Sequence, residues 1–331
     1  MVDDITMTSS QKNAAELLAL DVGDVLVNEP LRNHGTWQIG GPADVLVEPR
    51  SWDQLVRLRQ FIHERGLVSI VIGEGSNLLF DDAGLRGVCI KIGRSLSGFE
   101  IDPPRVRAEA GVAVPRLARA VGLAGLTGLE HTVGIPGTLG GLVVMNGGSR
   151  RHSLSENIVH VDAMDHRGRM HRRLREDCGF VYRGSAFQGL DWIVTGVEFE
   201  LSRGDKRAIW REMLEILRDR KGKFPRHDAP NCGSVFVSGG ELYEKCGPPG
   251  KVIESLGFKG TRIGDALCSP RHANFIVNVG QASSIDMMQL IRKIRDAVHG
   301  HTGIWMDCEV RHVSPKGKIL PVHETFGQDA A

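Results

Sequence analysis

Two glycine-rich segments contain the residue types that can hold a phosphate group. The first, GEGSNLLF at residues 73–80, follows a β-branched run and places Ser76 and Asn77 beside two glycines. Glycines let main-chain N–H groups converge on an anion, and the Ser and Asn side chains add further donors. The segment contains neither a Walker A motif nor the GxGxxG of a Rossmann fold. Taken alone, it is also typical of a strand-to-turn connection with Asn77 in the left-handed conformation.

The second segment, VGIPGTLGGLVVMNGG at residues 133–148, favours the ligand interpretation. Glycine loses more backbone entropy on ordering than other residues, so two long glycine loops would be costly for turns alone. The chain contains 41 glycines among 331 residues, well above the usual share of roughly 7%. Aromatic residues make up only 5%. This composition indicates a ligand site lined largely by backbone.

Three polar residues in separate segments are candidates for a chemical role. Arg183 stands among apolar residues in FVYRGSAF, where it either stabilises developing negative charge or pairs with a carboxylate as a strand residue. Ser234 follows a glycine in PNCGSVF and lacks the GxSxG elbow of a hydrolase nucleophile, and a turn hydroxyl is the alternative. Glu309 is central in the strand-like run WMDCEVR, where a cross-strand ion pair is the alternative.

The sequence indicates neither a metal site nor nucleic acid binding. The six cysteines are scattered, without a CxxC pair or a histidine at zinc-finger spacing. His299 and His301 straddle Gly300, where we expect a helix to end, so both are expected to be solvated. Lys and Arg number 41 against 40 Asp and Glu, which gives no overall field for a polyanion. The basic segments 170–176 and 218–227 have few interleaved aromatics, and the second could instead meet a substrate diphosphate.

The chain is expected to be cytoplasmic. Its start, MVDDITMTSSQKN, lacks the basic segment and apolar stretch of a signal peptide. No run approaches the roughly 20 apolar residues of a membrane span, so no membrane partner is expected.

The elements that must position the first glycine loop form a β-α-β unit. Ser51 and Gln54 make a capping-box pattern at the start of SWDQLVRLRQFIHERG, apolar residues recur on one helical face, and a glycine ends the pattern. Strands are predicted at 43–49 and 68–73 from their β-branched residues. The loop would therefore follow directly from a buried strand.

The remaining elements divide into a strand-rich and a helical part. Residues 96–204 contain strand-like pieces at 105–111, 158–168 and 191–201, with little that is long enough for a major helix. From Asp205 onward the apolar spacing becomes helical, which indicates the start of a last domain.

A second C-terminal helix is predicted over residues 284–299. Ser283 and Asp286 mark its start, and Gly300 marks its end.

In their order along the chain, these motifs resemble one family: MurB, the flavin-dependent UDP-N-acetylenolpyruvoylglucosamine reductase of peptidoglycan synthesis. The resemblance runs from TWQIGGPAD (36–44) through GEGSNLLF, GLEHTVGIPGTLGG, FVYRGSAF, PNCGSVF and HANFIVN (272–278) to CEVR. It implies an α+β protein in which a vanillyl-alcohol oxidase/PCMH-type FAD-binding fold in two subdomains precedes a C-terminal α+β substrate domain.

The resemblance also implies domain boundaries. An N-terminal tail and short helix would occupy 1–28, the FAD-binding domain 29–204, the substrate domain 205–322 and a C-terminal tail 323–331. The two subdomains of the FAD-binding domain would be about 29–95 and 96–204.

The activity implied is reduction of UDP-N-acetyl-3-O-(1-carboxyvinyl)-glucosamine, a UDP-sugar, to UDP-N-acetylmuramate. NADPH would be the reductant and FAD a non-covalent cofactor. The alternatives are a MurB-like paralogue that reduces a related enol ether or enamine, and a non-catalytic protein that binds flavin or nucleotide. Retention of Arg183, Ser234 and Glu309 argues against the non-catalytic protein.

The resemblance assigns roles residue by residue. Arg183 falls on the Arg of the YR-x-S motif, Ser234 on the Ser of the GS-x-F motif, and Glu309 on the Glu of the EVR motif. Ser234 would protonate the substrate, while Arg183 and Glu309 would orient and stabilise the enolate. Tyr182, Lys223 and Asn274 would contact substrate. The residues that would hold FAD are Gly73, Glu74, Gly75, Ser76, Asn77, Leu78, Ile135, Pro136, Gly137 and Thr138.

Two departures from the family pattern concern the substrate. Val237, Ser238 and Gly239 stand where members often have Lys-Asn-Pro, so a phosphate contact and an amide contact are missing there. Lys223 resembles another phosphate-contacting lysine of the family and is expected to compensate. The chain also lacks a tyrosine-bearing insertion, which is typical of the shorter branch of the family.

Overall fold

The computed structural model of the chain describes residues 9–225 and 229–326, which form two compact units. The first unit comprises the described residues of Met1–Glu29, with Ala43–Glu74 and Gly87–Arg218. The second comprises Pro30–Pro42, Gly75–Arg86 and the described residues of Asp219–Ala331. Unlike the contiguous domains predicted, the second unit takes segments 30–42 and 75–86 from the N-terminal half. The outer parts of both predicted tails, and the last two residues of the basic segment 218–227, lie outside the described residues.

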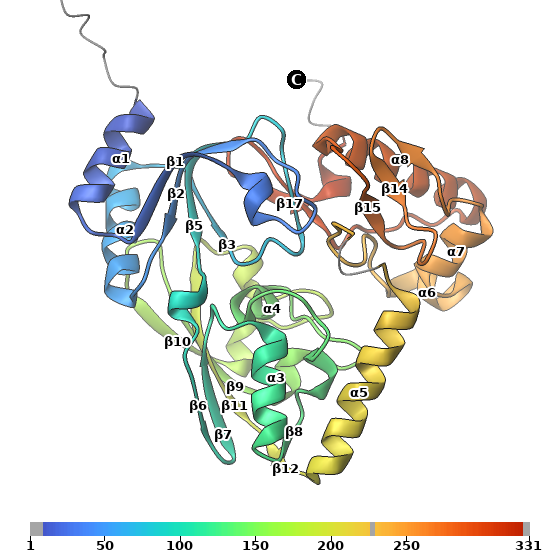
Figure 1. Cartoon of the computed structure of the whole chain (residues 1–331), viewed down its shortest axis with the longest axis horizontal. Helices are drawn as coiled ribbons and strands as arrows, with labels where there is room; N and C mark the ends of the chain where they lie inside the picture. Colours follow the sequence, from blue (N-terminus) through green and yellow to red (C-terminus); the bar gives the residue numbers. More distant parts are fainter. Residues whose placement is uncertain (1–8, 226–228, 327–331) are drawn as a thin grey trace, which may run out of the picture. The chain divides into compact units, whose positions relative to one another are not determined.

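A four-stranded sheet and two helices begin the first unit (Figure 1). The strand order is β1-β2-β5-β3, and β3 pairs parallel with β5. Leu55 and Leu58 share one core cluster with Val45 and Val88 of the sheet. The predicted helix and both predicted strands of this region are confirmed. The elements are α1 (Ser9–Ala19), β1 (Asp24–Pro30), β2 (Pro42–Glu48), α2 (Trp52–Arg65), β3 (Ser69–Ile72) and β5 (Leu85–Lys91).

The predicted capping box of α2 is shifted by one residue. Ser51 Oγ accepts a hydrogen bond from the Gln54 backbone N–H at 3.2 Å, as the pattern requires. The Gln54 side chain, however, accepts from the backbone N–H of Arg50 at 2.7 Å and not from that of Ser51. The helix start is thus satisfied by the same two side chains with a different donor.

A five-stranded antiparallel sheet, ordered β10-β9-β11-β7-β6, forms the rest of the first unit with short helices on one face. Helix α4 contacts β7 and β11, and Leu117 of α3 lies in the same core cluster as Val106 of the sheet. The expectation of little helix in this region is wrong at α3, which has ten residues. The elements are β6 (Phe99–Asp102), β7 (Arg105–Glu109), α3 (Val114–Leu123), α4 (Leu139–Val144), β9 (Ile158–Met164), β10 (Met170–Leu174) and β11 (Ile193–Glu200).

Two further strands and a long helix complete this part of the chain. Strands β8 (Leu126–Thr127) and β12 (Ser202–Arg203) pair antiparallel. Helix α5 (Lys206–Lys223) confirms the helical spacing predicted after Asp205. Its buried residues Ile209, Met213 and Ile216 pack with Ala118 and Val133, because they recur along one helical face.

The second unit contains two three-stranded sheets, ordered β13-β14-β15 and β17-β16-β4. Helix α8 contacts β13 and β14. Strand β4 is parallel to β16, which explains why segment 75–86 belongs to this unit. The elements are β4 (Leu78–Phe80), α6 (Gly240–Cys246), α7 (Pro249–Ser255), β13 (Arg262–Ile263), β14 (Ala266–Cys268), β15 (Ile276–Asn278), α8 (Ser284–Thr302), β16 (Arg311–Val313) and β17 (Ile319–Pro321).

Helix α8 starts as predicted but ends later. Ser283 and Asp286 form the capping box expected from the sequence. The predicted stop at Gly300 is wrong, because the helix continues to Thr302 and is capped by Gly303 with φ of 73°. The N–H of Gly303 bonds to the carbonyl of His299 at 2.7 Å, so the second glycine is the one that closes the helix. In the described part of the chain, no helix has the length and apolar character needed to cross a membrane.

Candidate active site

The first glycine loop, residues 73–78, leads from β3 into β4. Its left-handed residue is Gly75, with φ of 61°, and not Asn77 as the turn interpretation predicted. A Cβ at Gly75 would lie 2.3 Å from the backbone oxygen of His34. Close packing within the second unit therefore requires glycine here.

The second glycine loop, residues 135–138, lies between a 3-10 turn at Glu130–Thr132 and helix α4. Gly137 has φ of 122°, and the side chain of Thr138 is buried. A Cβ at Gly73 would lie 2.2 Å from Thr138 Oγ1, so the first loop is closely packed on the second at this point. The structure thus brings together predicted flavin-binding residues of both loops.

Two buried polar side chains shortly before the second loop were missed by the sequence analysis. Glu130 and His131 are each 5% exposed. Glu130 Oε2 accepts from the backbone N–H of Gly128 at 2.7 Å. Its Oε1 and the Nε2 of His131 have no hydrogen-bond partner among the described residues. Buried polar atoms normally have partners, so both are available to a bound ligand. A single Glu-His pair in a glycine-rich string gives no sequence signal of this kind.

His131 predicts an acid-dependent loss of stability. Burial, and to a lesser extent the nearby His152 ring, lowers the pKa of His131 to about 4. An unfolded histidine titrates near pH ~6.5, so between that pH and 4 only the unfolded state takes up the proton. The free energy of unfolding is therefore highest above the pKa of the unfolded state. It falls by roughly 3 kcal/mol as the pH approaches the pKa of His131 in the folded state. We expect His131→Phe to abolish this loss in thermal unfolding of flavin-free protein.

The exposed His301 provides the control for this measurement. His301→Phe should keep the acid-dependent loss of melting temperature that the unmodified chain shows. If His131→Phe loses stability with falling pH as steeply as the unmodified chain, another group causes the effect.

Arg183 lies in a tight turn and not in a strand. A bridge joins Val181 to Gly184, and Arg183 between them has φ of 57°. Its Nη2 donates to the Gly148 carbonyl at 2.9 Å, and its guanidinium lies 4.9 Å from the centre of the exposed Tyr182 ring. A non-glycine residue in this conformation is strained and persists only where its surroundings hold it.

Asn146 and Gln188 hold this turn, and the sequence analysis missed both. Asn146 Nδ2 donates to the Val181 carbonyl at 2.8 Å. Gln188 Nε2 donates to the Arg183 carbonyl at 3.2 Å. Each is a lone amide whose partner is defined only by folding, so no spacing in the sequence indicates it.

Ser234 opens a segment that is held on both sides within the second unit. The N–H of Val235 donates to the Asn274 carbonyl at 2.8 Å, and the Val235 carbonyl accepts from the N–H of Glu309 at 2.8 Å. The Ser234 hydroxyl forms no hydrogen bond within the described part of the chain. Ser234 and Glu309 therefore lie on adjoining segments, with the hydroxyl available to a ligand.

Asn274 supports the Ser234 segment. Its side chain is 1% exposed. Its Oδ1 accepts from the N–H of Phe236, and its Nδ2 donates to the Phe236 carbonyl, both at 2.9 Å. The predicted contact between Asn274 and substrate stays a prediction.

The prediction that Glu309 is central in a strand is wrong. Glu309 lies in a bend after the isolated bridge at Cys308, and β16 begins only at Arg311. The bend follows because the Glu309 N–H bonds to Val235 while its carbonyl accepts from Asn77 Nδ2 at 3.0 Å. The carboxylate is thus carried by an irregular segment that two neighbouring segments hold in place.

Lys223 is exposed at the end of α5. Its Nζ pairs with Asp219 Oδ1 at 2.5 Å, one helical turn earlier. This ion pair leaves the lysine at the surface and orients its ammonium group along the helix.

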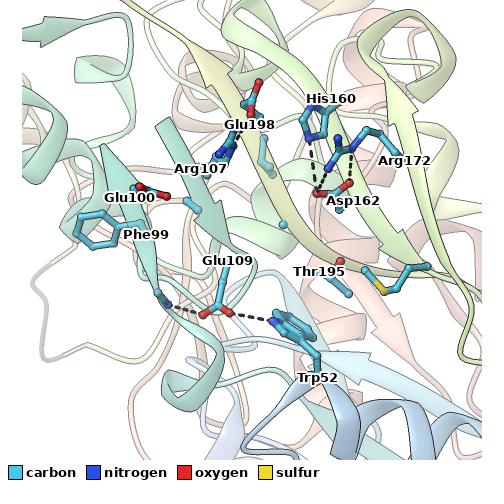
Figure 2. A pocket seen from close by; sticks show the side chains of 15 residues that line it. Trp52, Phe99, Glu100, Arg107, Glu109, His160, Asp162, Arg172, Thr195 and Glu198 are labelled. Atoms are coloured by element: carbon cyan, nitrogen blue, oxygen red, sulfur yellow. Dashed lines mark hydrogen bonds and ion pairs between the residues drawn. The ribbon is translucent and has the colours of Figure 1, made fainter. Parts of the chain in front are cut away.

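A pocket of about 430 Å³ lies on the five-stranded sheet of the first unit, and the predicted site residues do not line it (Figure 2). Arg107 pairs with Glu198 at 2.6 Å, and Arg172 pairs with Asp162 at 2.9 Å. Trp52 Nε1 donates to Glu109 at 2.8 Å. Most of the charged side chains that line the pocket are thus paired with one another. Within 9–225 and 229–326, no group of three or more His, Cys, Asp or Glu side chains could hold a metal ion.

Comparison with known proteins assigns both parts of the chain. Residues 43–173 match the family described as FAD binding domain, and residues 225–313 match the C-terminal domain of UDP-N-acetylenolpyruvoylglucosamine reductase. The chain is 44% identical over 294 residues to UDP-N-acetylenolpyruvoylglucosamine reductase 1 of Corynebacterium glutamicum, covering 89% of this chain and 88% of that protein. It is 42% identical over 301 residues to the reductase of Heliobacterium modesticaldum, covering 89% and 92%.

A solved structure agrees with this assignment. The crystal structure of UDP-N-acetylenolpyruvylglucosamine reductase (MurB) from Thermus caldophilus matches with a TM-score of 0.71 and 32% identity, covering 87% of this chain and 98% of that chain. The predicted α+β fold, a PCMH-type FAD-binding domain with a C-terminal domain, is confirmed. The chain belongs to the UDP-N-acetylenolpyruvoylglucosamine reductase family.

Proposed function

We propose that the chain reduces UDP-N-acetylenolpyruvoylglucosamine to UDP-N-acetylmuramate, with NADPH as reductant, in peptidoglycan precursor synthesis. The observation that carries the proposal lies in the second unit. Ser234 and Glu309, the expected proton donor and stabilising acid, are on segments joined by the hydrogen bond from Glu309 N–H to the Val235 carbonyl. The cytoplasmic location and the shorter family branch stay predictions.

The residues present fit a bound FAD. The two glycine loops meet at Gly73 and Thr138, where the lack of a side chain at Gly73 leaves room for the Thr138 side chain. Glu130 Oε1 and His131 Nε2 are buried polar atoms that lack partners among the described residues. The dinucleotide offers many donors and acceptors to such atoms. We propose that residues 73–78 and 135–138 hold it without a covalent bond.

The proposed chemistry divides between cofactor and protein. FAD, when bound and reduced by NADPH, would supply the hydride that adds to the vinyl carbon of the enolpyruvyl ether. The electron pair left on the α-carbon is delocalised into the adjacent carboxylate. Arg183 orients that carboxylate and stabilises its added charge, and Glu309 does the same by sharing a proton. Ser234 Oγ gives its proton to the α-carbon, which a weak acid can do because the enolate is strongly basic. The Ser234 oxygen then recovers a proton from water.

Lys223 predicts a selective effect on substrate affinity. It lies in the basic segment, and Val237 replaces a lysine that many family members have. Lys223→Ala should raise KM for the UDP-sugar by roughly tenfold, as expected for one charge-assisted phosphate contact, while KM for NADPH changes little. Steady-state kinetics measures both. Lys221→Ala, two residues away on the exposed helix end, is the matched control. Equal changes in both KM values would indicate that Lys223 pairs only with Asp219 and does not contact the substrate phosphate.

One experiment tests the proposed function directly. The purified protein should be yellow, and NADPH oxidation should accelerate on addition of UDP-N-acetylenolpyruvoylglucosamine, with UDP-N-acetylmuramate identified by mass. Equal acceleration by a simple enolpyruvyl ether without the UDP group would instead indicate a paralogue with another substrate. Absence of flavin after reconstitution would contradict the proposal altogether.

A further inference from the structure

Parallel strand pairing places two proposed functional segments at the same end of one sheet. Strand β4 pairs with β16 in the register Leu78 to Arg311. The first glycine loop runs into the start of β4, and Glu309 lies two residues before the start of β16. Because the strands are parallel, the residues before each strand start are neighbours. The loop proposed to hold flavin phosphates therefore lies beside the backbone that carries Glu309.

The side chain of Asn77 ties the two segments together. Its Nδ2 donates to the Glu309 carbonyl at 3.0 Å, and the backbone carbonyl of Asn77 accepts from the Arg311 N–H at 3.1 Å. These bonds bracket Glu309 and Val310, the bend that interrupts regular strand structure. The side-chain amide of Asn77 thus donates at least one hydrogen bond to the protein itself, and not all of its hydrogen bonds go to a ligand phosphate.

The same bend is bonded on its other side to the Ser234 segment. Glu309 N–H donates to the Val235 carbonyl at 2.8 Å, and Val235 follows Ser234 directly. Glu309 therefore has its carbonyl held by Asn77 and its N–H held by Val235. A displacement of Asn77 reaches Glu309 through one hydrogen bond and Ser234 through the next.

We infer that Asn77 is a positioning residue that couples occupancy of the flavin loop to the placement of Glu309. Its backbone belongs to the glycine loop, while its side chain holds the carbonyl of the residue that stabilises the enolate. Flavin binding, by ordering the loop, would set Glu309 before substrate arrives. The inference rests on the proposed function, because it assumes that Glu309 acts on the substrate and that residues 73–78 hold FAD.

The first test uses Asn77→Asp, which is isosteric and lacks the N–H donor, together with Asn77→Ala. Protonation of the substrate should slow by roughly tenfold, the effect of one lost hydrogen bond. Rapid mixing of the reduced enzyme with UDP-N-acetylenolpyruvoylglucosamine measures this rate. With FAD kept at saturating concentration, reduction of the bound flavin by NADPH should slow much less than the substrate half-reaction. In the Glu309→Gln background the Asn77 substitutions should have almost no further effect on the substrate half-reaction, because Asn77 acts through Glu309.

A second readout does not depend on turnover. Amide hydrogen exchange in wild-type protein should become slower at Glu309 and Val310 when FAD is added to the flavin-free protein. In Asn77→Ala, at an FAD concentration high enough to saturate the variant, exchange at these two amides should no longer respond to the cofactor. Asn157→Ala is the matched control, because Asn157 Nδ2 also donates to a backbone carbonyl, that of Gly128, at 2.9 Å. It should leave the FAD response of Glu309 intact.

The outcomes separate this inference from the proposed function. If Glu309→Gln alone leaves the substrate half-reaction unchanged, the proposed role of Glu309 is wrong. If Glu309→Gln slows it but the effects of the Asn77 and Glu309 substitutions simply add, Asn77 does not act through Glu309 and the inference is overturned. An unchanged response of Glu309 exchange to FAD in Asn77→Ala overturns it as well.

Discussion

Ser234→Ala should slow the substrate half-reaction by roughly 10²–10⁴-fold, the range expected for losing a positioned general acid. Reduction of the bound flavin by NADPH needs no proton donor at the substrate's α-carbon and should stay nearly unchanged. The reason is local, since the Ser234 hydroxyl has no bond within the described residues while its backbone is held by Asn274 and Glu309 through Val235. Rapid mixing of each half-reaction measures the two rates separately.

Two further variants sharpen this prediction. Ser234→Cys, a stronger acid of similar shape, should restore part of the lost rate. Ser255→Ala removes a hydroxyl that only bonds its own helix, at the Val252 carbonyl, and should leave both half-reactions unchanged. If Ser234→Ala slows both half-reactions together, Ser234 acts through packing or cofactor position, and the proton-donor role is lost.

Gly141→Val should remove flavin from the protein without unfolding it. A Cβ at Gly141 would meet only Thr138 Oγ1, at 3.7 Å, so the chain itself has room for a side chain. That space lies beside Thr138, which we propose contacts FAD. We expect the flavin content of the purified variant to fall at least roughly tenfold while its far-UV circular dichroism is kept; a helical Gly→Val change alone costs little.

Glycine-to-valine changes at other positions control for the effect of the substitution on the backbone. Gly75→Val is a poorer test, because its Cβ would lie 2.3 Å from the His34 backbone oxygen and strain the loop itself. Gly300→Val changes a helical glycine with nothing within 4 Å and should keep full flavin content. Gly141→Val protein that purifies with full flavin content would show that the cofactor does not lie beside Thr138.

Local pattern was sufficient for several elements. Helix α2 was predictable because the Ser51 hydroxyl can accept from the free N–H of Gln54 and apolar residues recur at helical spacing. Helix α3 was not anticipated, because its core-facing residues lie within a glycine-rich and alanine-rich stretch that has no side-chain cap. The end of α8 was placed three residues early, since Gly300 and Gly303 are equally good stops and only the backbone conformation distinguishes them.

The candidate site shows where local information ends. Residue types and their order along the chain identify Arg183, Ser234 and Glu309 as candidates and relate the chain to its family. This is possible because residue identity alone defines these chemical groups. The sequence does not contain the conformations that carry them. Arg183 has a positive φ in a turn held by Asn146 and Gln188, and Glu309 lies in a bend where a strand was expected.

Those conformations depend on partners that are distant in sequence. Asn77 reaches the Glu309 carbonyl across 232 positions of the chain, and Gly73 meets Thr138 from another loop. Hydrogen bonds and close contacts of this kind form only once the strands have paired, so no window of the sequence contains both partners. The chemistry of each group is therefore set by residue identity, whereas its orientation and its neighbours are set by long-range packing.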